Sequence, residues 1–298
     1  MRNAFKWIVI TVGSVVGVIG IAVIAVFVLS QRHFNQTYDI QVASVPISQD
    51  SATLALGEHL VQIRGCTDCH GPDLAGKPFM EDPKIAMLYA SNLTSGKGGV
   101  APNYTDEDWV RSIRHGVRPD GKPLFFMPSQ EFFFLSDEDL GAMISYIKTL
   151  PPVDRELPRS SVGPLGRVLF LTGKLPLVSA EMINHEAPRP EVPPPGITAE
   201  YGRYLALGCV GCHGLDLAGG RVPGAPPDWP MAANLTPAGN LKNWTEAEFI
   251  QTMRTGVKPN GEMFNAAMPW QNAAAMTDLE LRAVWKFLKS LPPVEKGS

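Results

Sequence analysis

Acidic residues are missing from the start of this sequence, and charge is scarce throughout. Only 18% of the 298 residues are Asp, Glu, Lys or Arg, against the ~25% usual in soluble domains. The first 32 residues hold three bases and no acid, so the remaining 266 carry 23 bases and 29 acids, a net charge of −6. Without a basic excess, the composition argues against nucleic acid as a partner, because polyphosphate binding depends on clustered Lys and Arg.

A sustained alternation of apolar and polar residues is also missing, and cysteines are few. No segment shows the period of two that marks a half-buried strand, so we expect an all-α protein. The four cysteines fall into two identical motifs and leave none over for a free thiol. Glycine and proline are abundant instead, with 28 and 27 residues, which predicts long loops between short helices.

An apolar run of 25 residues without a charge occupies residues 7–31. This length crosses a ~30 Å hydrocarbon core as a helix, and it exceeds the ~7–15 apolar residues of a signal peptide. We therefore expect residues 1–32 to form one retained transmembrane helix in the lipid bilayer. The alternative is a cleaved signal peptide, for which Val28-Leu29-Ser30 would be the small-residue cleavage site.

The flanking charges orient this helix. Arg2 and Lys6 precede the run, and after Arg32 the next base is Arg64, so the positive-inside rule leaves the N-terminus in the cytoplasm and exports the rest. Gly13 and Gly17 place small residues on one helix face, which permits close packing on the membrane helix of a partner.

The exported part contains two copies of one pattern, offset by 140 to 145 residues, which indicates a duplicated domain. Both copies carry helix-start signals with an acid three residues on, and double proline follows the last helix of each. We expect domains at 52–153 and 198–295, joined by a Pro-rich linker at 154–197. The main matches are Gly57-Glu58-His59-Leu60 with Gly202-Arg203-Tyr204-Leu205, Asn92-Leu93-Thr94 with Asn234-Leu235-Thr236, Arg114-His115-Gly116 with Arg254-Thr255-Gly256, and Leu150-Pro151-Pro152-Val153 with Leu291-Pro292-Pro293-Val294.

Both cysteine pairs belong to Cys-x-x-Cys-His motifs, at 66–70 and 209–213. On one helical turn the two sulfurs meet the two vinyl groups of a haem, and the following His lies under the iron. A redox dithiol would not need the His, and a Cys₄ zinc site would leave both histidines unused. Two covalently bound haem c groups are therefore predicted, attached through Cys66, Cys69, Cys209 and Cys212, with His70 and His213 as axial ligands.

The sixth iron ligand must come from farther along each copy. Met127 follows His70 by 57 residues, Met268 follows His213 by 55, and proline comes next in both cases. A thioether opposite His suits low-spin iron, although a Met more often fills gaps in a core. Symmetry favours the methionines, because the nearest rival aligns with a threonine in the second copy. The rival ligands for the first haem are His115, His59 and His185.

Several aligned polar residues are candidates for hydrogen bonds near the haem edge, either to propionates or to loop carbonyls. Each has an ordinary alternative as a turn Asn or a helix-end Arg. These candidates are Asn92, Trp109, Arg114, Asn234 and Arg254.

Taken together, the motifs resemble the class I c-type cytochromes. More narrowly, residues 52–155 and 197–295 are similar to the multihaem cytochrome c subunits of bacterial membrane-bound alcohol and gluconate dehydrogenases, through Gly-Cys-x-x-Cys-His-Gly, Asn-Leu-Thr, Ala-Met-Pro-Trp and Leu-Pro-Pro-Val. The resemblance implies all-α haem domains with His/Met iron on the periplasmic side of the bacterial inner membrane. Those subunits usually have three haems and a cleaved signal, and here the first copy has Phe126-Met127-Pro128-Ser129 in place of Ala-Met-Pro-Trp.

The leading functional hypothesis is a membrane-tethered electron carrier rather than an enzyme. It would relay single electrons between a redox donor and an acceptor of a respiratory or photosynthetic chain, alone or within a larger complex. One alternative is the electron-transfer subunit of a membrane-bound alcohol or sugar dehydrogenase. Another is a dihaem peroxidase, which needs one iron with a displaceable ligand and therefore unequal copies; the two copies here are even.

Overall fold

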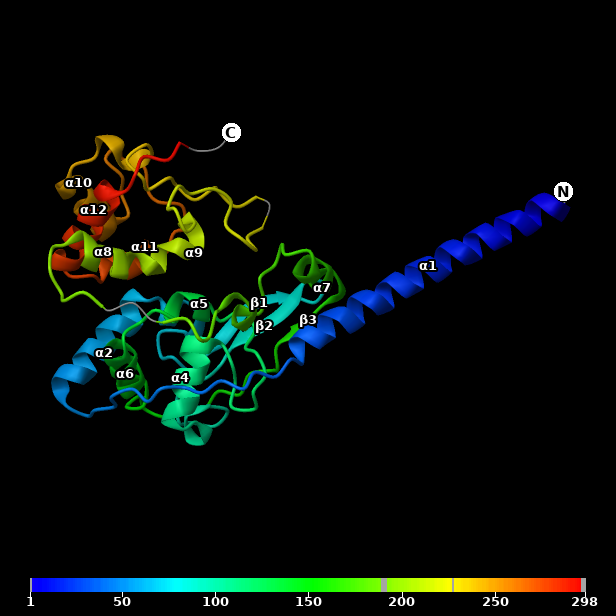
Figure 1. Cartoon of the computed structure of the whole chain (residues 1–298), viewed down its shortest axis with the longest axis horizontal. Helices are drawn as coiled ribbons and strands as arrows, with labels where there is room; N and C mark the ends of the chain where they lie inside the picture. Colours follow the sequence, from blue (N-terminus) through cyan, green and yellow to red (C-terminus); the bar gives the residue numbers. More distant parts are fainter. Residues whose placement is uncertain (1, 189–191, 227, 296–298) are drawn as a thin grey trace.

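The computed structural model describes residues 2–188, 192–226 and 228–295. Figure 1 shows a long N-terminal helix that projects from a head made of two mostly helical halves, one from each copy of the repeat. The first copy lies next to the base of the long helix, and the second lies alongside the first, above it in this view.

Helix α1 (Arg2–Phe34) is the part of the described chain that is long and apolar enough to cross a membrane. Its apolar side chains are exposed along most of its length, whereas Ser30 and Phe34 at its end are buried against the head. A helix that is apolar all round belongs in a protein core or in lipid, and most of α1 touches no protein. The expected apolar segment is therefore a single continuous helix, long enough to cross a membrane.

The two copies repeat the same order of helices. In the first copy these are α2 (Ser51–Ile63), α3 (Cys66–His70), η1 (Ala101–Asn103), α4 (Asp106–His115), α5 (Ser129–Phe132) and α6 (Asp137–Ile147). In the second they are α8 (Ala199–Leu205), η3 (Ala206–Cys209), α9 (Val210–His213), η4 (Asn240–Asn243), α10 (Glu246–Thr255), α11 (Trp270–Ala274) and α12 (Asp278–Ser290).

The helix ends follow the local signals in the sequence. Thr105 and Thr245 open α4 and α10 with reciprocal capping boxes, and Thr277 does the same for α12. Gly116 and Gly256 end α4 and α10 in the left-handed conformation, with φ of 66° and 71°, which glycine adopts without a Cβ clash. The periodic apolar faces of α6 and α12 are buried as expected.

One glycine in each copy sets the crossing of the first and last helices. A Cβ at Gly57 of α2 would lie 2.0 Å from the carbonyl oxygen of Ala142 in α6. The equivalent Gly202 of α8 stands in the same relation to Ala283 of α12, also at 2.0 Å. The repeated glycine is thus explained by close approach of two backbones.

A small sheet was not expected from the sequence. Strands β1 (Lys77–Asp82) and β2 (Ala86–Ala90) form an antiparallel hairpin, and β3 (Ser161–Val162) pairs antiparallel with β2. None of the three alternates apolar and polar residues, β1 contains Pro78, and β3 comes from a distant part of the chain, so periodicity could not reveal them. At the corresponding place in the described part of the second copy, Gly220 and Ala232 form an isolated antiparallel bridge.

The first part of the segment expected as a linker is folded onto the first copy. Strand β3, helix α7 (Pro164–Leu171) and the turn η2 (Ser179–Met182) pack beside the sheet and the end of α1. Leu175, Leu177 and Val178 are buried there with Phe34. Part of the expected linker therefore packs on the first domain.

Filling the helix crossing should destabilise the second domain. In Gly202→Ala the new methyl group would overlap the Ala283 carbonyl, and overpacking of this kind costs about 1–3 kcal/mol. Thermal unfolding of the haem-loaded protein measures the loss. Gly196→Ala is the matched control, because the nearest atom to a Cβ there is 3.7 Å away. Equal melting temperatures for the two variants would contradict the role given to Gly202.

Candidate functional site

Each Cys-x-x-Cys-His motif forms a short helical turn bounded by glycine. In the first copy, Gly65 precedes α3 and Gly71 follows it with φ of 82°; Gly214 follows α9 with φ of 81°. The four cysteines, all within the described residues, form no disulfide. The sequence therefore places two thiols and an imidazole on one turn, twice.

The thiols lack the electrostatics of a redox dithiol. Burial raises the pKa of Cys66 to about 12 and that of Cys209 to about 11, whereas reactive dithiols depend on a lowered pKa. Within the described part of the chain, no three metal-ligating His, Cys, Asp or Glu side chains cluster together. The two cysteine pairs are accordingly not gathered into a Cys₄ site.

Both motif histidines are held by a backbone carbonyl. Nδ1 of His70 lies 2.8 Å from the oxygen of Ser91, and Nδ1 of His213 lies 2.7 Å from the oxygen of Ala233. A carbonyl only accepts, so Nδ1 carries the proton and Nε2 keeps its lone pair. Burial lowers the pKa of both imidazoles and so favours the neutral form that binds iron. This donor set fits a haem c at each motif.

The asparagines hold those carbonyls in place. Nδ2 of Asn92 donates to the oxygen of Val153 over 2.8 Å, and its Oδ1 accepts from the backbone N–H of Thr94 over 2.9 Å. Asn92 directly follows Ser91, so this clamp fixes the acceptor of the His70 imidazole. The second copy repeats it from Asn234 to Val294 and Thr236. Asn-x-Thr and Pro-Pro-Val thus recur because they form one contact.

The two methionines occupy equivalent turns. Met127 and Met268 are both half-buried, and the prolines after them have nearly the same conformation, with φ/ψ of −80°/55° and −79°/60°. In both copies the methionine carbonyl accepts over 2.8 Å from an N–H two residues on. The rival histidines have polar partners of their own: His115 contacts His185 with 3.0 Å between their Nδ1 atoms, and Nε2 of His59 lies 2.9 Å from Oε1 of Glu280.

The other candidates divide into two groups. Trp109 is 2% exposed, and its indole N–H has no hydrogen-bond partner among the described residues. Because a buried donor without a partner costs free energy, this N–H suits an acceptor at the edge of a haem. The second copy has Phe249 at this position. Arg114 donates to the carbonyls of Leu135 and Ser136, and Arg254 to that of Met276, so both hold the start of the last helix.

The contact between the copies, which sequence reasoning missed, brings both motifs to one interface. Figure 1 shows α5 of the first copy close to α9 and α11 of the second. Asn272 of α11 donates to Asp68 of the first motif over 2.6 Å. Glu131 of α5 lies against Gly211 of the second motif, where a Cβ would be 2.1 Å from its Oε1. Asn272 and Glu131 occupy the same position of the repeat, four residues after Met268 and Met127 respectively.

A second pair of contacts obeys the same symmetry. Nε2 of His59 lies 2.9 Å from Oε1 of Glu280, the acid of the α12 capping box. Tyr204 aligns with His59, and its hydroxyl donates to Asp139 of α6. Residue i of one copy thus contacts residue j of the other, and j contacts i, as in a two-fold dimer. Comparing aligned positions could have suggested the symmetry, but only the structure shows which pairs meet.

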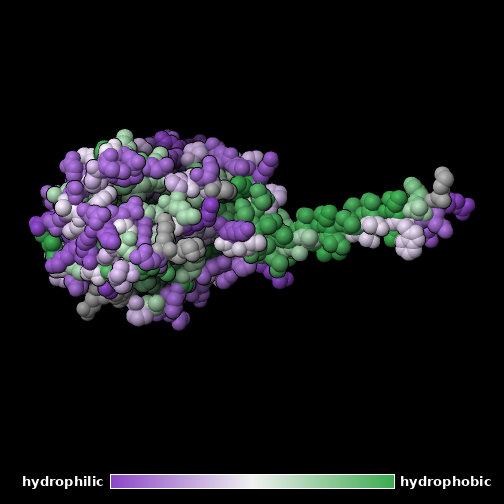
Figure 2. Space-filling model, turned by 90° about the horizontal axis from the view of Figure 1, so that it is seen from above, coloured by the Kyte–Doolittle hydropathy of each residue, from purple (hydrophilic) through white to green (hydrophobic). Residues whose placement is uncertain are grey.

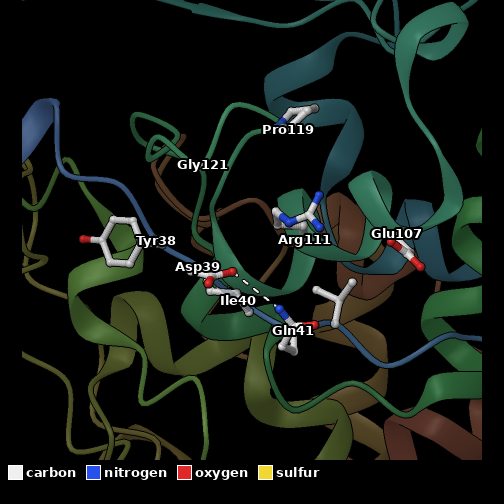
Figure 3. Close-up of a pocket in the computed structure, with 9 residues that line it drawn as sticks. Tyr38, Asp39, Ile40, Gln41, Glu107, Arg111, Pro119 and Gly121 are labelled. Carbon is white, nitrogen blue, oxygen red and sulfur yellow. Dashed lines mark hydrogen bonds between the residues drawn. The ribbon is translucent and has the colours of Figure 1, made fainter.

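One pocket is lined by residues outside both motifs. Figure 3 shows it between the extended segment after α1, with Tyr38, Asp39 and Gln41, and Arg111 of α4. Gln41 donates to Asp39 over 3.5 Å inside it. None of the predicted haem residues lines this pocket, so it takes no part in the candidate site.

Breaking the second asparagine clamp should loosen the second domain. Asn234 is buried, and Asn234→Ala would leave the carbonyl of Val294 and the N–H of Thr236 without their partner, at a cost of about 1–3 kcal/mol. Denaturant unfolding of the haem-loaded protein measures the change. The exposed turn residue Asn260 gives the control variant Asn260→Ala, for which we expect a change within about 0.5 kcal/mol. A neutral Asn234→Ala would contradict the clamp.

Comparisons with known proteins agree with this geometry. A family model described as Cytochrome c matches residues 54–151 and 199–292. The cytochrome c subunit of alcohol dehydrogenase (quinone) from Gluconobacter oxydans is 30% identical over 283 residues, covering 83% of this chain and 56% of that protein. The fructose dehydrogenase cytochrome subunit of Gluconobacter japonicus is 26% identical over 290 residues, covering 83% and 54%. The gluconate 2-dehydrogenase cytochrome c subunit of Pantoea cypripedii is 27% identical over 276 residues, covering 82% and 62%.

The chain spans about half the length of the first of these relatives. Within the chain, the family model covers both copies of the repeat and both Cys-x-x-Cys-His motifs, which together make up more than half of the residues. Cytochrome c domains carry covalently bound haem c. This chain therefore belongs to the cytochrome c family, with two mostly helical copies of the domain behind an N-terminal apolar helix suited to membrane anchoring.

Proposed function

We propose that the protein is an electron carrier with two haem c groups, one held by Cys66, Cys69, His70 and Met127 and the other by Cys209, Cys212, His213 and Met268. The observation that carries the proposal is the neutral imidazole fixed through Nδ1 in both copies, each paired with a methionine in the same turn. Bound haem supplies one-electron iron chemistry. Two protein ligands on each iron leave no position for a substrate.

In this proposal, the carrier is a subunit of a membrane-bound dehydrogenase complex. Relatives that are 26–30% identical to this chain are named as cytochrome subunits of alcohol, fructose and gluconate dehydrogenases. In this proposal a separate subunit oxidises the substrate, and the present chain takes its electrons one at a time and passes them to an acceptor of the respiratory chain. The more general role, a relay between other respiratory or photosynthetic partners, uses the same residues.

The membrane topology follows from α1. We infer that α1 crosses the bacterial cytoplasmic membrane once, with Arg2 and Lys6 inside and both haem domains in the periplasm. A Cβ built at Gly13 or Gly17 meets no atom within 4 Å. This open stripe suits close packing on a helix of a partner subunit.

Spectra of the purified protein test the ligand assignment. We expect both haems to be low-spin in the visible and EPR spectra, and Met268→Leu to convert one of the two to a high-spin form, since leucine has no donor atom. Met263→Leu is the control, because Met263 is 64% exposed and lies outside both motifs. A five-coordinate, high-spin haem in the wild-type protein would refute the proposal and favour the dihaem peroxidase.

Purification in mild detergent tests the assignment to a complex. We expect a larger dehydrogenase polypeptide to remain bound to the full-length chain and to reduce its haems when substrate is added. A chain that purifies alone and accepts electrons only from small redox proteins would identify a free, tethered relay instead.

Removal of one carboxylate should shift one reduction potential. Glu131 lies at the second motif, and its negative charge stabilises ferric over ferrous haem because the ferric form carries one more positive charge. Burial raises the pKa of Glu131 to about 7, although the positive charge of Arg64 acts in the opposite direction. The carboxylate is therefore charged above about pH 7 and neutral below it. In a potentiometric titration, Glu131→Gln should raise one of two midpoint potentials at about pH 8.5 and change neither at about pH 5.5.

The control for this variant is Glu138→Gln, which removes an exposed carboxylate in the first turn of α6. It should leave both potentials almost unchanged, because solvent screens an exposed charge. Equal shifts in the two variants, or a Glu131→Gln shift that is the same at both pH values, would contradict the role of Glu131.

A further inference from the structure

Helix α7 is fastened to the last turns of the membrane helix. Nη1 of Arg167 donates to Oγ of Ser30 over 2.7 Å, and its guanidinium carbon lies 4.4 Å from the ring centroid of Phe27. The ring of Phe170 packs on Phe34 with 5.0 Å between centroids. The position of α7 relative to the end of α1 is therefore fixed by three kinds of contact.

This end of α1 lies at the boundary of the bilayer. About 20 helical residues cross the hydrocarbon core, and counted from Trp7 these end at Val26. Phe27, which Arg167 covers, is the next residue, and its neighbours Val28 and Leu29 are still 43% and 47% exposed. Since α7 contacts residues 27–34, it lies at the height of the lipid headgroups.

The outer face of α7 is apolar. Leu165 and Val168 are 47% and 42% exposed, and a spacing of three places them on the same side of the helix. Figure 2 shows that the hydrophobic surface of α1 continues without a break onto the adjoining end of the head. Leu165 and Val168 therefore extend the lipid-facing surface of the anchor.

Basic residues flank this face. Lys84, whose carbonyl accepts from the N–H of Leu165, lies at the start of α7, and Lys174 follows its end; both are exposed, as is Arg32 on α1. Apolar side chains bordered by bases suit an anionic membrane surface. The guanidinium of Arg167 donates to Ser30 and Gln31 and lies over the rings of Phe27 and Phe34.

We propose that α7 lies in the headgroup layer as a second membrane contact, with Leu165 and Val168 inserted among the lipids. The inference rests on the proposed anchoring of α1. It means that the first haem domain is held at a fixed height and tilt on the membrane surface instead of swinging on a tether. The orientation would limit which face of the head a redox partner can approach.

Cysteine labelling of the full-length, haem-loaded protein in phospholipid vesicles tests the contact. The native cysteines are bound to haem, so a single introduced cysteine is the only reactive thiol. Val168→Cys is compared with Leu279→Cys, because the two side chains are 42% and 40% exposed in the protein alone. With a membrane-impermeant maleimide, we expect Val168→Cys to react at least about tenfold more slowly, since a thiol in lipid does not ionise.

Each outcome bears on a separate claim. Equal rates at the two positions in vesicles would overturn the membrane contact of α7 and leave the anchor intact. Protection of Val168→Cys only in a purified complex, and not in vesicles of the isolated chain, would assign the face to a protein partner and also overturn it. Failure of the protein to enter vesicles would refute the anchoring, and labelling of the wild-type cysteines would refute haem attachment.

Discussion

The hydrogen bond from each motif imidazole to a backbone carbonyl is the contact on which the rest of both domains depends. It fixes the tautomer and the ring direction of His70 and His213, so that Nε2 is free. The carbonyls are held in turn by Asn92 and Asn234, which reach the loops after α6 and α12. In each small domain, one chain of hydrogen bonds thus connects the histidine of the motif to the loop after the last helix.

The duplicated domains meet as an internal two-fold dimer, and the departures from symmetry are informative. At the start of α12, Glu280 completes a capping box and also contacts His59 of the first copy. At the start of α6, the hydroxyl of Tyr204 from the second copy accepts from the N–H of Ser136 and donates to Asp139. The symmetric contact brings both Cys-x-x-Cys-His motifs to one interface. The charged side chains there, Asp68, Glu131 and Arg64, are not repeated between the copies, so the two motifs have different charged neighbours. The two motifs, alike in sequence, therefore differ in the charges around them.

Packed contacts join α1 to the head. Phe34 is buried, the segment that follows donates from Tyr38 to the carbonyl of Gly121 over 2.8 Å, and Ser48 reaches Ser145 of α6. Arg167 closes the junction from the other side. The head and the anchor consequently form one continuous packed unit around the end of α1.

The sequence by itself determined the helices, the duplication and the chemistry of the two motifs, because these depend on residues that are close along the chain: capping boxes at Thr105 and Thr245, apolar periods in α6 and α12, and Cys-x-x-Cys-His. It did not reveal the β1–β2–β3 sheet or the packing of residues 154–183, since these rest on pairing between distant segments without a periodic signal. Arg114 and Arg254 looked like haem-edge donors or helix-end residues, and only the fold placed them on the start of the last helix. The meeting of Glu131 with Gly211, and of α7 with the membrane helix, was likewise decided by tertiary structure, because long-range contacts depend on how whole faces pack and not on any local pattern.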